Sequence, residues 1–308
     1  TGQDVNDSRE QWMYNRNPKE PLFHFDNRIL AYFGCDLYEA IMATELKGEK
    51  TYFMPFNQGS NGAGNVGGAG NPPSEDGDYA TSYLWKKVLR RDVLLAILQR
   101  YIMRQEETTI SLIMDKHGKE KEVKHTSTKI IFPRYHQLDA VEKLIHDTAK
   151  NGAGKNYLIQ HSAGSGKSNS IAWLTYRLAS LHNSENTNIF NGVFVITDRR
   201  VLNHQLQNTI LGFEHVEGAV TTITEKDANA SEKLKEAINA EKTGIVITTL
   251  QRFPQIYQEV NRQGGKNYAI VVDEAHSSQS GKSAEKLKAA LADTDEALKE
   301  MAEWEDKT

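Results

Sequence analysis

A lysine set among small residues marks the place in this chain where phosphate chemistry is possible. Residues 156–174 read NYLIQHSAGSGKSNSIAWL, two apolar stretches on either side of a short polar loop. Glycine allows the backbone to turn several N–H groups inward, and a helix that begins at Lys167 would direct its positive end to the same point. We therefore expect a phosphate-binding loop whose nucleotide-binding residues are Gly164, Ser165, Gly166, Lys167 and Ser168.

The end of this loop has the residue types that a nucleoside triphosphate and Mg²⁺ require. Lys167 is expected to reach the β and γ phosphates, and Ser168 to ligate Mg²⁺ through its hydroxyl. The spacing departs from the general Gly-x-x-x-x-Gly-Lys-Ser pattern, because His161 stands where the first glycine would be. An ordinary Gly-Ser turn is the alternative. A second Gly-Lys-Ser, at residues 281–283, has no strand-like run before it, and we expect no site there.

A carboxylate pair, Asp273 and Glu274, follows the apolar run YAIVV. At the end of a buried strand, Asp273 would serve the Mg²⁺ site and Glu274 would polarise an attacking water, as phosphoryl transfer to water requires. The predicted catalytic residues are thus Lys167, Asp273 and Glu274, and the predicted metal ligands are Ser168 and Asp273. An Asp-Glu pair after a strand is common by itself, so this interpretation depends on the phosphate loop.

The elements that would position these residues alternate regularly in the second half of the chain. The strand-like runs NYLIQ, GVFVIT, AVTTIT, GIVITTL and YAIVVDE are separated by helical stretches such as SNSIAWLTYRLASL and ASEKLKEAINAE. This pattern predicts an α/β fold with a parallel sheet and helices on both faces. Ligands of such sheets bind at the carboxyl ends of the strands, where the loop and the acidic pair both lie.

The first part of the chain has a different pattern. Residues 21–56 alternate short apolar runs with polar breaks, which predicts a smaller mixed α/β segment. Residues 57–73, NQGSNGAGNVGGAGNPP, predict a loop. A single basic amphipathic helix is expected over residues 81–103 behind a Thr81/Ser82 cap, and residues 105–130 are polar with one short strand-like run. The expected domains are residues 1–128 and 129–308.

Composition excludes several classes of protein. The 308 residues are 38% hydrophobic, and 37 basic against 41 acidic residues leave a net charge of -4, so any nucleic-acid contact must use a local basic face. A single cysteine, Cys35, excludes a disulfide framework and a cysteine-built zinc site. The absence of an apolar run of about 18 residues and of a signal-peptide pattern predicts a soluble, cytoplasmic protein without a membrane partner. The missing initial methionine suggests a fragment of a longer chain.

Asp36, Glu45 and Lys47 imitate the Asp and Glu-x-Lys metal site of restriction nucleases. Those carboxylates normally end a buried strand, whereas EAIMATELKGEK has the composition of a helix or an edge strand. In a helix, Asp36 and Glu45 would face opposite sides and could not share one ion. Paired strands would leave the geometry open. We expect no nuclease centre in this segment.

The combined motifs resemble those of a known family. SAGSGKS, VITDRRVLNHQ, IVITTLQRF and VVDEAHSSQSG have the order and spacing of the first recombinase-like lobe of superfamily 2 helicases and translocases. His161 before the loop, DRRVLNHQ and SSQSG are most similar to the motor (R) subunit of type I restriction enzymes. The run from RNPKEPLFHFDNRILAYF through PFNQGSNGAGNVGGAGNPP to TSYLW is similar to that family's segment between nuclease and motor.

This resemblance implies an ATP-dependent translocase on double-stranded DNA, with ATP and Mg²⁺ as cofactors and the modification (methyltransferase) and specificity subunits as partners. Residues 1–128 would hold the end of the nuclease domain and a linker, and residues 129–308 the first ATPase lobe. Without the second motor lobe, the isolated chain should hydrolyse ATP weakly or not at all. The resemblance assigns Gln137 to adenine recognition, His276 to coupling, and six residues to DNA binding: Arg199, Arg200, Gln205, Thr248, Thr249 and Gln251.

Simpler interpretations stay open at this point. Gln137 could be a polar residue at a helix start, and Arg199 and Arg200 could lie on a solvated helix start. A superfamily 2 helicase of another pathway would separate DNA strands, which distinguishes it from a translocase on intact duplex. A non-hydrolysing ATP-binding scaffold would tolerate Glu274→Gln in the full-length protein.

We predict weak, sequence-independent DNA binding that falls steeply with salt, because the expected contacts are to phosphates. Replacement of Arg199 and Arg200 by alanine should flatten the slope of log affinity against log salt by up to roughly two units, about one for each released counterion. Fluorescence anisotropy of a labelled duplex over a salt series measures this slope. An unchanged slope would favour the alternative in which both arginines lie on a solvated helix start and do not contact DNA.

Overall fold

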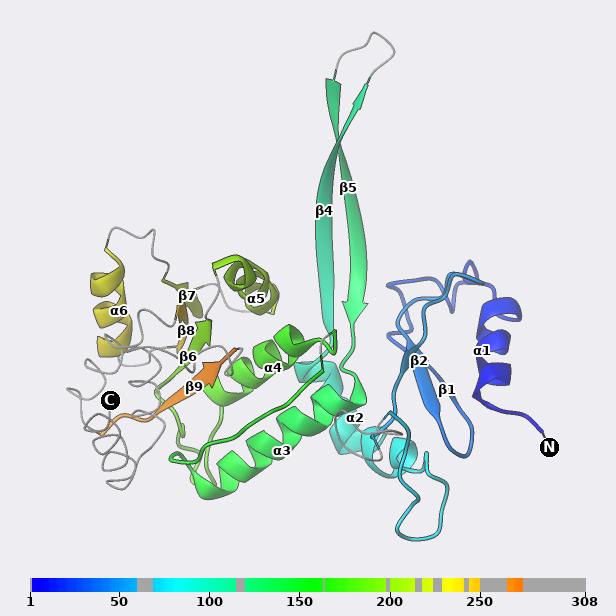
Figure 1. Ribbon diagram of the computed structural model, residues 1–308, viewed down its shortest axis with the longest axis horizontal. Coiled ribbons are helices and arrows are strands. Elements are labelled where there is room, and N and C mark those ends of the chain that lie inside the picture. Colours follow the sequence, from blue (N-terminus) through cyan, green and yellow to red (C-terminus); the bar gives the residue numbers. More distant parts are fainter. Residues whose placement is uncertain are drawn as a thin grey trace, which may run out of the picture. The chain divides into compact units, whose positions relative to one another are not determined.

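The computed structural model describes residues 2–59, 69–114, 120–162, 164–197, 200–213, 218–223, 229–240, 244–249 and 265–273. The chain has a mixed α/β fold, as predicted, and it divides into two compact units, residues 1–138 and 139–308 (Figure 1). Residue 129, where the sequence suggests a domain boundary, lies inside strand β5, Glu120–Ile131. Within the described ranges, no helix is both long and apolar enough to span a bilayer.

The second unit contains the predicted parallel sheet. Its strands are β6 (Gly192–Thr197), β7 (Val220–Thr222), β8 (Gly244–Thr249) and β9 (Tyr268–Val272), in the order β7-β8-β6-β9. All three pairings are parallel, and the two central strands, β8 and β6, are largely apolar runs buried on both faces, as is typical of a covered parallel sheet. Four of the five expected strands are therefore confirmed.

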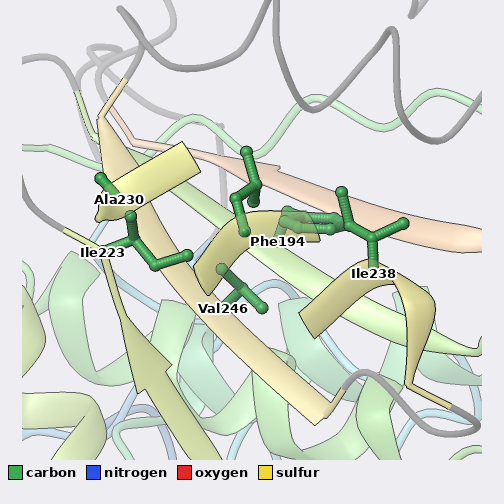
Figure 2. Packing of buried hydrophobic residues seen from close by; sticks show 6 residues of the cluster. Phe194, Ile223, Ala230, Ile238 and Val246 are labelled. Carbon is green, nitrogen blue, oxygen red and sulfur yellow. The ribbon is translucent and has the colours of Figure 1, made fainter. Parts of the chain in front are cut away.

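Helices cover both faces of this sheet. Helix α6 (Ala230–Asn239) packs Ala230 and Ile238 against Phe194 and Val246, as Figure 2 shows. Successive side chains of a strand alternate between faces, so Val195 and its neighbours belong to the opposite face. Helices α4 (Lys167–Ala179) and α5 (Arg200–Gly212) also contact β6 and β8. Trp173 of α4 contacts Phe213, the residue directly after α5, with ring centroids 5.6 Å apart.

The expected strand at residues 156–160 was wrong. This segment forms no strand, and the side chain of Leu158 is 86% exposed. Tyr157 instead donates its hydroxyl to Asp147 of helix α3 (Tyr135–Asn151) at 2.7 Å, and Lys155 pairs with the same carboxylate at 3.1 Å. Both contacts lower the pKa of Asp147, and the hydrogen bond from Tyr157 has the larger effect. An apolar run becomes a strand only where a neighbouring strand offers its edge, and the pattern alone does not show which edge that is.

The first unit contains a small antiparallel sheet, so the expected mixed α/β segment is confirmed. Strands β1 (Tyr32–Cys35), β2 (Ala40–Ala43) and β3 (Met54–Pro55) pair in chain order, and helix α1 (Val5–Tyr14) lies beside β1. The helical alternative for residues 39–50 was wrong, because β2 is a fully buried strand. Four apolar side chains in succession suit burial on both faces as well as they suit a helix.

Asp36 organises the turn between β1 and β2. Its Oδ1 accepts the backbone N–H groups of Tyr38 and Glu39, both at 2.7 Å. Its Oδ2 accepts the N–H of Val5 at 2.9 Å and so joins helix α1 to the hairpin. The carboxylate therefore serves the fold of this unit.

A chain of edge-to-face aromatic contacts forms the core of the first unit. Phe56 contacts Phe33, Phe132 and Tyr135, with ring centroids 5.1, 6.4 and 6.0 Å away. Tyr83 lies 5.0 Å from Tyr135 and donates its hydroxyl to the carbonyl of Phe56 at 2.6 Å. Burial raises the pKa of Tyr83. Since Tyr135 is the first residue of α3, this core holds the start of that helix.

The prediction of a single helix over residues 81–103 was wrong, because the segment forms two separate helical parts. The chain forms a π-helical turn, η1 (Leu84–Val88), breaks at Leu89 and Arg90, and resumes as α2 (Arg91–Arg100). The break turns the apolar side chains of the two parts in different directions. Leu84 and Val88 are buried, whereas two leucines of the expected stripe are exposed, Leu95 at 54% and Leu98 at 44%.

The polar segment from residue 105 to 130 forms a long two-stranded ribbon, where only one short strand was expected. Strand β4 (Met103–Met114) pairs antiparallel with β5 (Glu120–Ile131) along their whole length, as the twisted ribbon in Figure 1 shows. Many of its side chains are polar and exposed on both faces, so the alternation of a half-buried strand is missing. Cross-strand pairs such as Thr108 and Thr126, whose hydroxyls are 3.2 Å apart, support it instead.

The glycine-rich stretch, residues 57–73, is a loop wherever it is described, as predicted. Its two ends are joined at the base, where Gly59 donates its N–H to the carbonyl of Gly70 at 2.8 Å. The side chain of Asn71 bridges Gln58 and Asn57 at 2.8 and 2.9 Å. The base of the loop is therefore fixed to the small sheet.

We predict that Asp36→Ala lowers the free energy of unfolding by about 1–2 kcal/mol, because three backbone N–H groups lose their acceptor. Asp36→Asn keeps one acceptor oxygen and should lose less. Glu45→Ala removes only an exposed ion pair with Lys47, at 2.7 Å, and should cost below about 1 kcal/mol. Urea denaturation measures all three, and equal losses for Asp36→Ala and Glu45→Ala would contradict the turn-capping role.

Candidate functional site

The loop before α4 turns at two glycines, and the N–H of Ser165 donates to the carbonyl of Ser162 at 3.3 Å. Gly164 and Gly166 have φ angles of +73° and +83°, in the left-handed region that glycine adopts without strain. A side-chain carbon at Gly164 would meet no atom within 4 Å, so the backbone angle requires glycine there, and crowding does not. Ser165, between them, is buried. Ala163 lies outside the described residues.

Helix α4 begins immediately after this loop, with Gly166 as its N-cap and Lys167 as its first residue. Glycine has no side chain that could accept from the first-turn N–H groups, and no side-chain cap is formed. The helix start therefore offers N–H donors, a partial positive charge and a lysine at one point. Phosphate fits this donor set, and the hydroxyl of Ser168 beside it is a hard oxygen ligand of the kind that Mg²⁺ prefers.

An ion pair holds α4 in place. Arg177, only 11% exposed, contacts Glu142 of α3 through two guanidinium nitrogens, at 2.5 and 3.5 Å. The buried face of α4, with Trp173 at 1% exposure, packs against the rest of the unit. The phosphate loop thus leads into a rigid helix, as a site that must hold a fixed geometry requires.

Asp273 directly follows β9, and its N–H donates to the carbonyl of Ile196 on β6 at 2.9 Å. This bond belongs to the last pair of the parallel register, Ile196 with Val272, so Asp273 lies just beyond the end of β9 at the carboxyl edge of the sheet. Glu274 and His276, predicted for water activation and coupling, lie outside the described residues. In the part of the chain that the structure describes, no three acidic, histidine or cysteine side chains gather into a metal site. Mg²⁺ held by Ser168 and Asp273 would therefore depend on phosphate oxygens for further ligands.

Gln137, predicted to recognise adenine, has a structural role at the start of α3. Its side chain is 2% exposed, and its Oε1 accepts the backbone N–H of Arg134 at 2.8 Å. A glutamine at the third helical position that accepts the N–H of the residue before the helix forms one half of a capping box. Gln137 belongs to the first unit. Its contact with a nucleotide base stays a prediction.

Four of the residues predicted to bind DNA lie in the described part of the chain. Thr248 and Thr249 end β8 and are 0% and 3% exposed. Arg200 begins α5, three residues after β6 ends, and Gln205 lies in the same helix. Arg199 and Gln251 lie outside the described residues. Thr248 and Thr249 thus lie at the carboxyl edge of the sheet, Arg200 and Gln205 lie in α5, and contact with DNA stays a prediction.

Asp36 and Glu45 are not brought together. Asp36 follows β1 at the hairpin turn, whereas Glu45 follows β2 at the opposite end of the same pair of strands, since Cys35 pairs with Ala40 and Tyr32 with Ala43. Glu45 contacts Lys47, and Asp36 binds backbone N–H groups. The two carboxylates are therefore separated along paired strands, and the helical argument for their separation was wrong.

The sequence analysis passed over Thr197, the last residue of β6. It is 1% exposed and lies level with Thr249, and Ile196 beside it accepts from Asp273. The available signal was three threonines at the ends of two strand-like runs, VIT and ITT. Only the register between the strands shows that Thr197 and Thr249 are neighbours.

Comparison with known families gives one match. Residues 136–296 fit the family described as SWI2/SNF2 ATPase, which is more than half of the chain. The match begins at the start of α3 and includes the phosphate loop, the parallel sheet and Asp273. No curated protein sequence matches the chain.

We predict that Gln137→Met lowers the free energy of unfolding by about 1 kcal/mol, because the N–H of Arg134 loses its acceptor. If Gln137 also reads adenine, the same variant should lose preference for ATP over GTP, since the amide no longer pairs with the base. Gln137→Glu is the matched control: the carboxylate still accepts at the helix start but cannot donate to a base. Restored stability without restored preference is the expected result. Unchanged base preference in both variants would leave Gln137 a capping residue only.

Proposed function

The chain belongs to the SWI2/SNF2 ATPase family, and we propose that it is the nucleotide-binding lobe of an ATP-driven motor that translocates on double-stranded DNA. One observation carries this proposal: the glycine-capped start of α4 and the carboxylate of Asp273 lie in one α/β unit, the first as a phosphate cradle and the second at the carboxyl edge of the sheet. These are the two chemical requirements for binding a nucleoside triphosphate with its metal.

Each residue of the lobe would have a separate task. The N–H groups around Gly164, Ser165 and Gly166 would bind the phosphates, with Lys167 adding charge at the β and γ positions. Ser168 and Asp273 would hold Mg²⁺, which when bound neutralises charge that develops on the phosphates. Glu274 would orient and polarise the attacking water.

Adenine recognition and DNA contact complete the proposed motor. Gln137 would pair with the base, in addition to its capping contact with Arg134. The DNA backbone would be contacted from the carboxyl edge of the sheet and the start of α5, and His276 would couple the nucleotide site to that contact. The assigned DNA-binding residues are Arg199, Arg200, Gln205, Thr248, Thr249 and Gln251. Arginine, amide and hydroxyl groups suit phosphate contacts, which position a motor without reading sequence.

We further propose that this motor is part of the R subunit of a type I restriction enzyme, and that it moves DNA before cleavage. The support is the similarity of DRRVLNHQ, SSQSG and the His161 loop to that family, together with the similar segment upstream of the motor. Residues 1–128 would then be the end of the nuclease domain and the linker, and residues 129–308 the first ATPase lobe. The partners would be double-stranded DNA and the modification and specificity subunits, in the cytoplasm.

We predict that Lys167→Ala abolishes binding of a fluorescent ATP analogue in the presence of Mg²⁺, because the variant removes the cation at the helix start. Fluorescence titration of the purified chain measures this affinity. Lys282→Ala, in the second Gly-Lys-Ser of the chain, is the matched control and should bind like the unaltered protein. Undiminished binding in Lys167→Ala would falsify the assignment of the loop.

A further inference from the structure

Three buried threonine hydroxyls at the carboxyl edge of the sheet, those of Thr197, Thr248 and Thr249, have no hydrogen-bond partner within the described ranges, and those of Thr197 and Thr249 lie on the same face. Thr197 ends β6 with 1% exposure, and Thr249 ends β8 with 3% exposure. Backbone groups in a parallel sheet satisfy one another, but a threonine side chain must find its own partner. Among the described residues, the hydroxyls of Thr197 and Thr249 have no such partner.

These hydroxyls do not stabilise the fold as it stands. A buried hydroxyl without a partner loses its bonds to water and gains nothing in return. Valine has the same shape without this penalty, and valine and isoleucine occupy the neighbouring positions Val195 and Ile247 on the same face. Threonine at these strand ends is therefore better suited to a functional hydrogen bond than to packing.

The strand register places Thr197 between Thr249 on β8 and Asp273 after β9. Thr197 pairs with Thr249, and Ile196 pairs with Val272, so that Asp273 follows level with Thr197. Paired residues of parallel strands point to the same face, which here is the face opposite Phe194 and the α6 cluster of Figure 2. Since neighbouring strands are about 4.8 Å apart, side-chain oxygens in this row come within hydrogen-bonding reach by rotation about χ1.

We propose that Thr197 is a positioning residue for Asp273. When the nucleotide and Mg²⁺ are bound, the hydroxyl of Thr197 donates to one oxygen of the Asp273 carboxylate and leaves the other oxygen for the metal. Thr249 donates in turn to the Thr197 hydroxyl, so each hydroxyl uses its single proton. A carboxylate that ligates a metal is commonly oriented by such a hydrogen bond. This inference rests on the proposed metal role of Asp273.

The test measures the affinity of the purified chain for a fluorescent ATP analogue, once with Mg²⁺ and once with EDTA. Mg²⁺ should raise the affinity of the unaltered chain, and in Thr197→Val this increase should be about tenfold smaller. A tenfold loss lies within the range expected when a metal ligand loses the hydrogen bond that orients it. The affinity in EDTA should not change. Thr197→Ser, which keeps the hydroxyl, should restore the Mg²⁺-dependent gain.

The melting temperature of the metal-free protein separates positioning from a structural role. Thr197→Val should leave it unchanged or raise it by about 2–4 °C, because an unpartnered buried hydroxyl is removed. Thr148→Val is the control: Thr148 is equally buried, at 2%, but its hydroxyl bonds to Tyr157 at 3.4 Å. That variant should lower the melting temperature and leave the Mg²⁺-dependent gain as it was.

The outcomes distinguish a wrong positioning role for Thr197 from a wrong metal role for Asp273. If Asp273→Asn loses the Mg²⁺-dependent gain and Thr197→Val retains it, the positioning role is wrong and the proposed nucleotide site stands. If Asp273→Asn retains the gain, the metal role of Asp273 is itself wrong. A lower melting temperature together with weaker binding in EDTA for Thr197→Val would show a structural residue and would also overturn the inference.

Discussion

The parallel pairing of β6 with both β8 and β9 is the constraint on which the rest of the second unit depends. Gly192 of β6 pairs with Gly244 and with Tyr268, so all three strands begin at one level; β6 and β8 end level with each other, and β9 ends one residue earlier. Their carboxyl ends therefore form a single edge, where Thr197, Thr249 and Asp273 meet. A shift of one residue in either pairing would move these side chains to the opposite face of the sheet.

The buried interior of the sheet makes that register stable. Phe194 and Val246 pack against α6 on one face, and the side chains of the other face are equally buried. Because both faces are apolar, polar groups are confined to the strand ends, where they can reach a ligand. The unpartnered hydroxyls at this edge follow from the same arrangement, because the last residues of β6 and β8 are still buried although their side chains are polar. Packing and function thus compete at these positions.

One residue that was predicted to bind the nucleotide has a role in the fold. Gln137 caps α3 through Arg134, and the same helix begins in the aromatic core of the first unit. Asp36 shows the opposite case: its carboxylate resembles a metal ligand in sequence, yet its oxygens are committed to three backbone N–H groups. Residue type and spacing cannot distinguish these cases, because the backbone partners are set by a turn that brings distant residues together.

The sequence by itself determined the local features of this protein: the glycine turn before α4, four parallel strands, the helices between them and the glycine-rich loop. These depend on glycine conformations and hydrophobic periodicity, which act over a few residues. Only the tertiary structure decided that residues 156–160 attach to Asp147, that the polar residues from 105 to 130 pair as a ribbon, and that Thr197 lies beside Asp273. The partners are close along the chain in the first two cases and far apart in the third, but in each the choice among possible partners is made by packing and register, which hydrophobic periodicity does not contain.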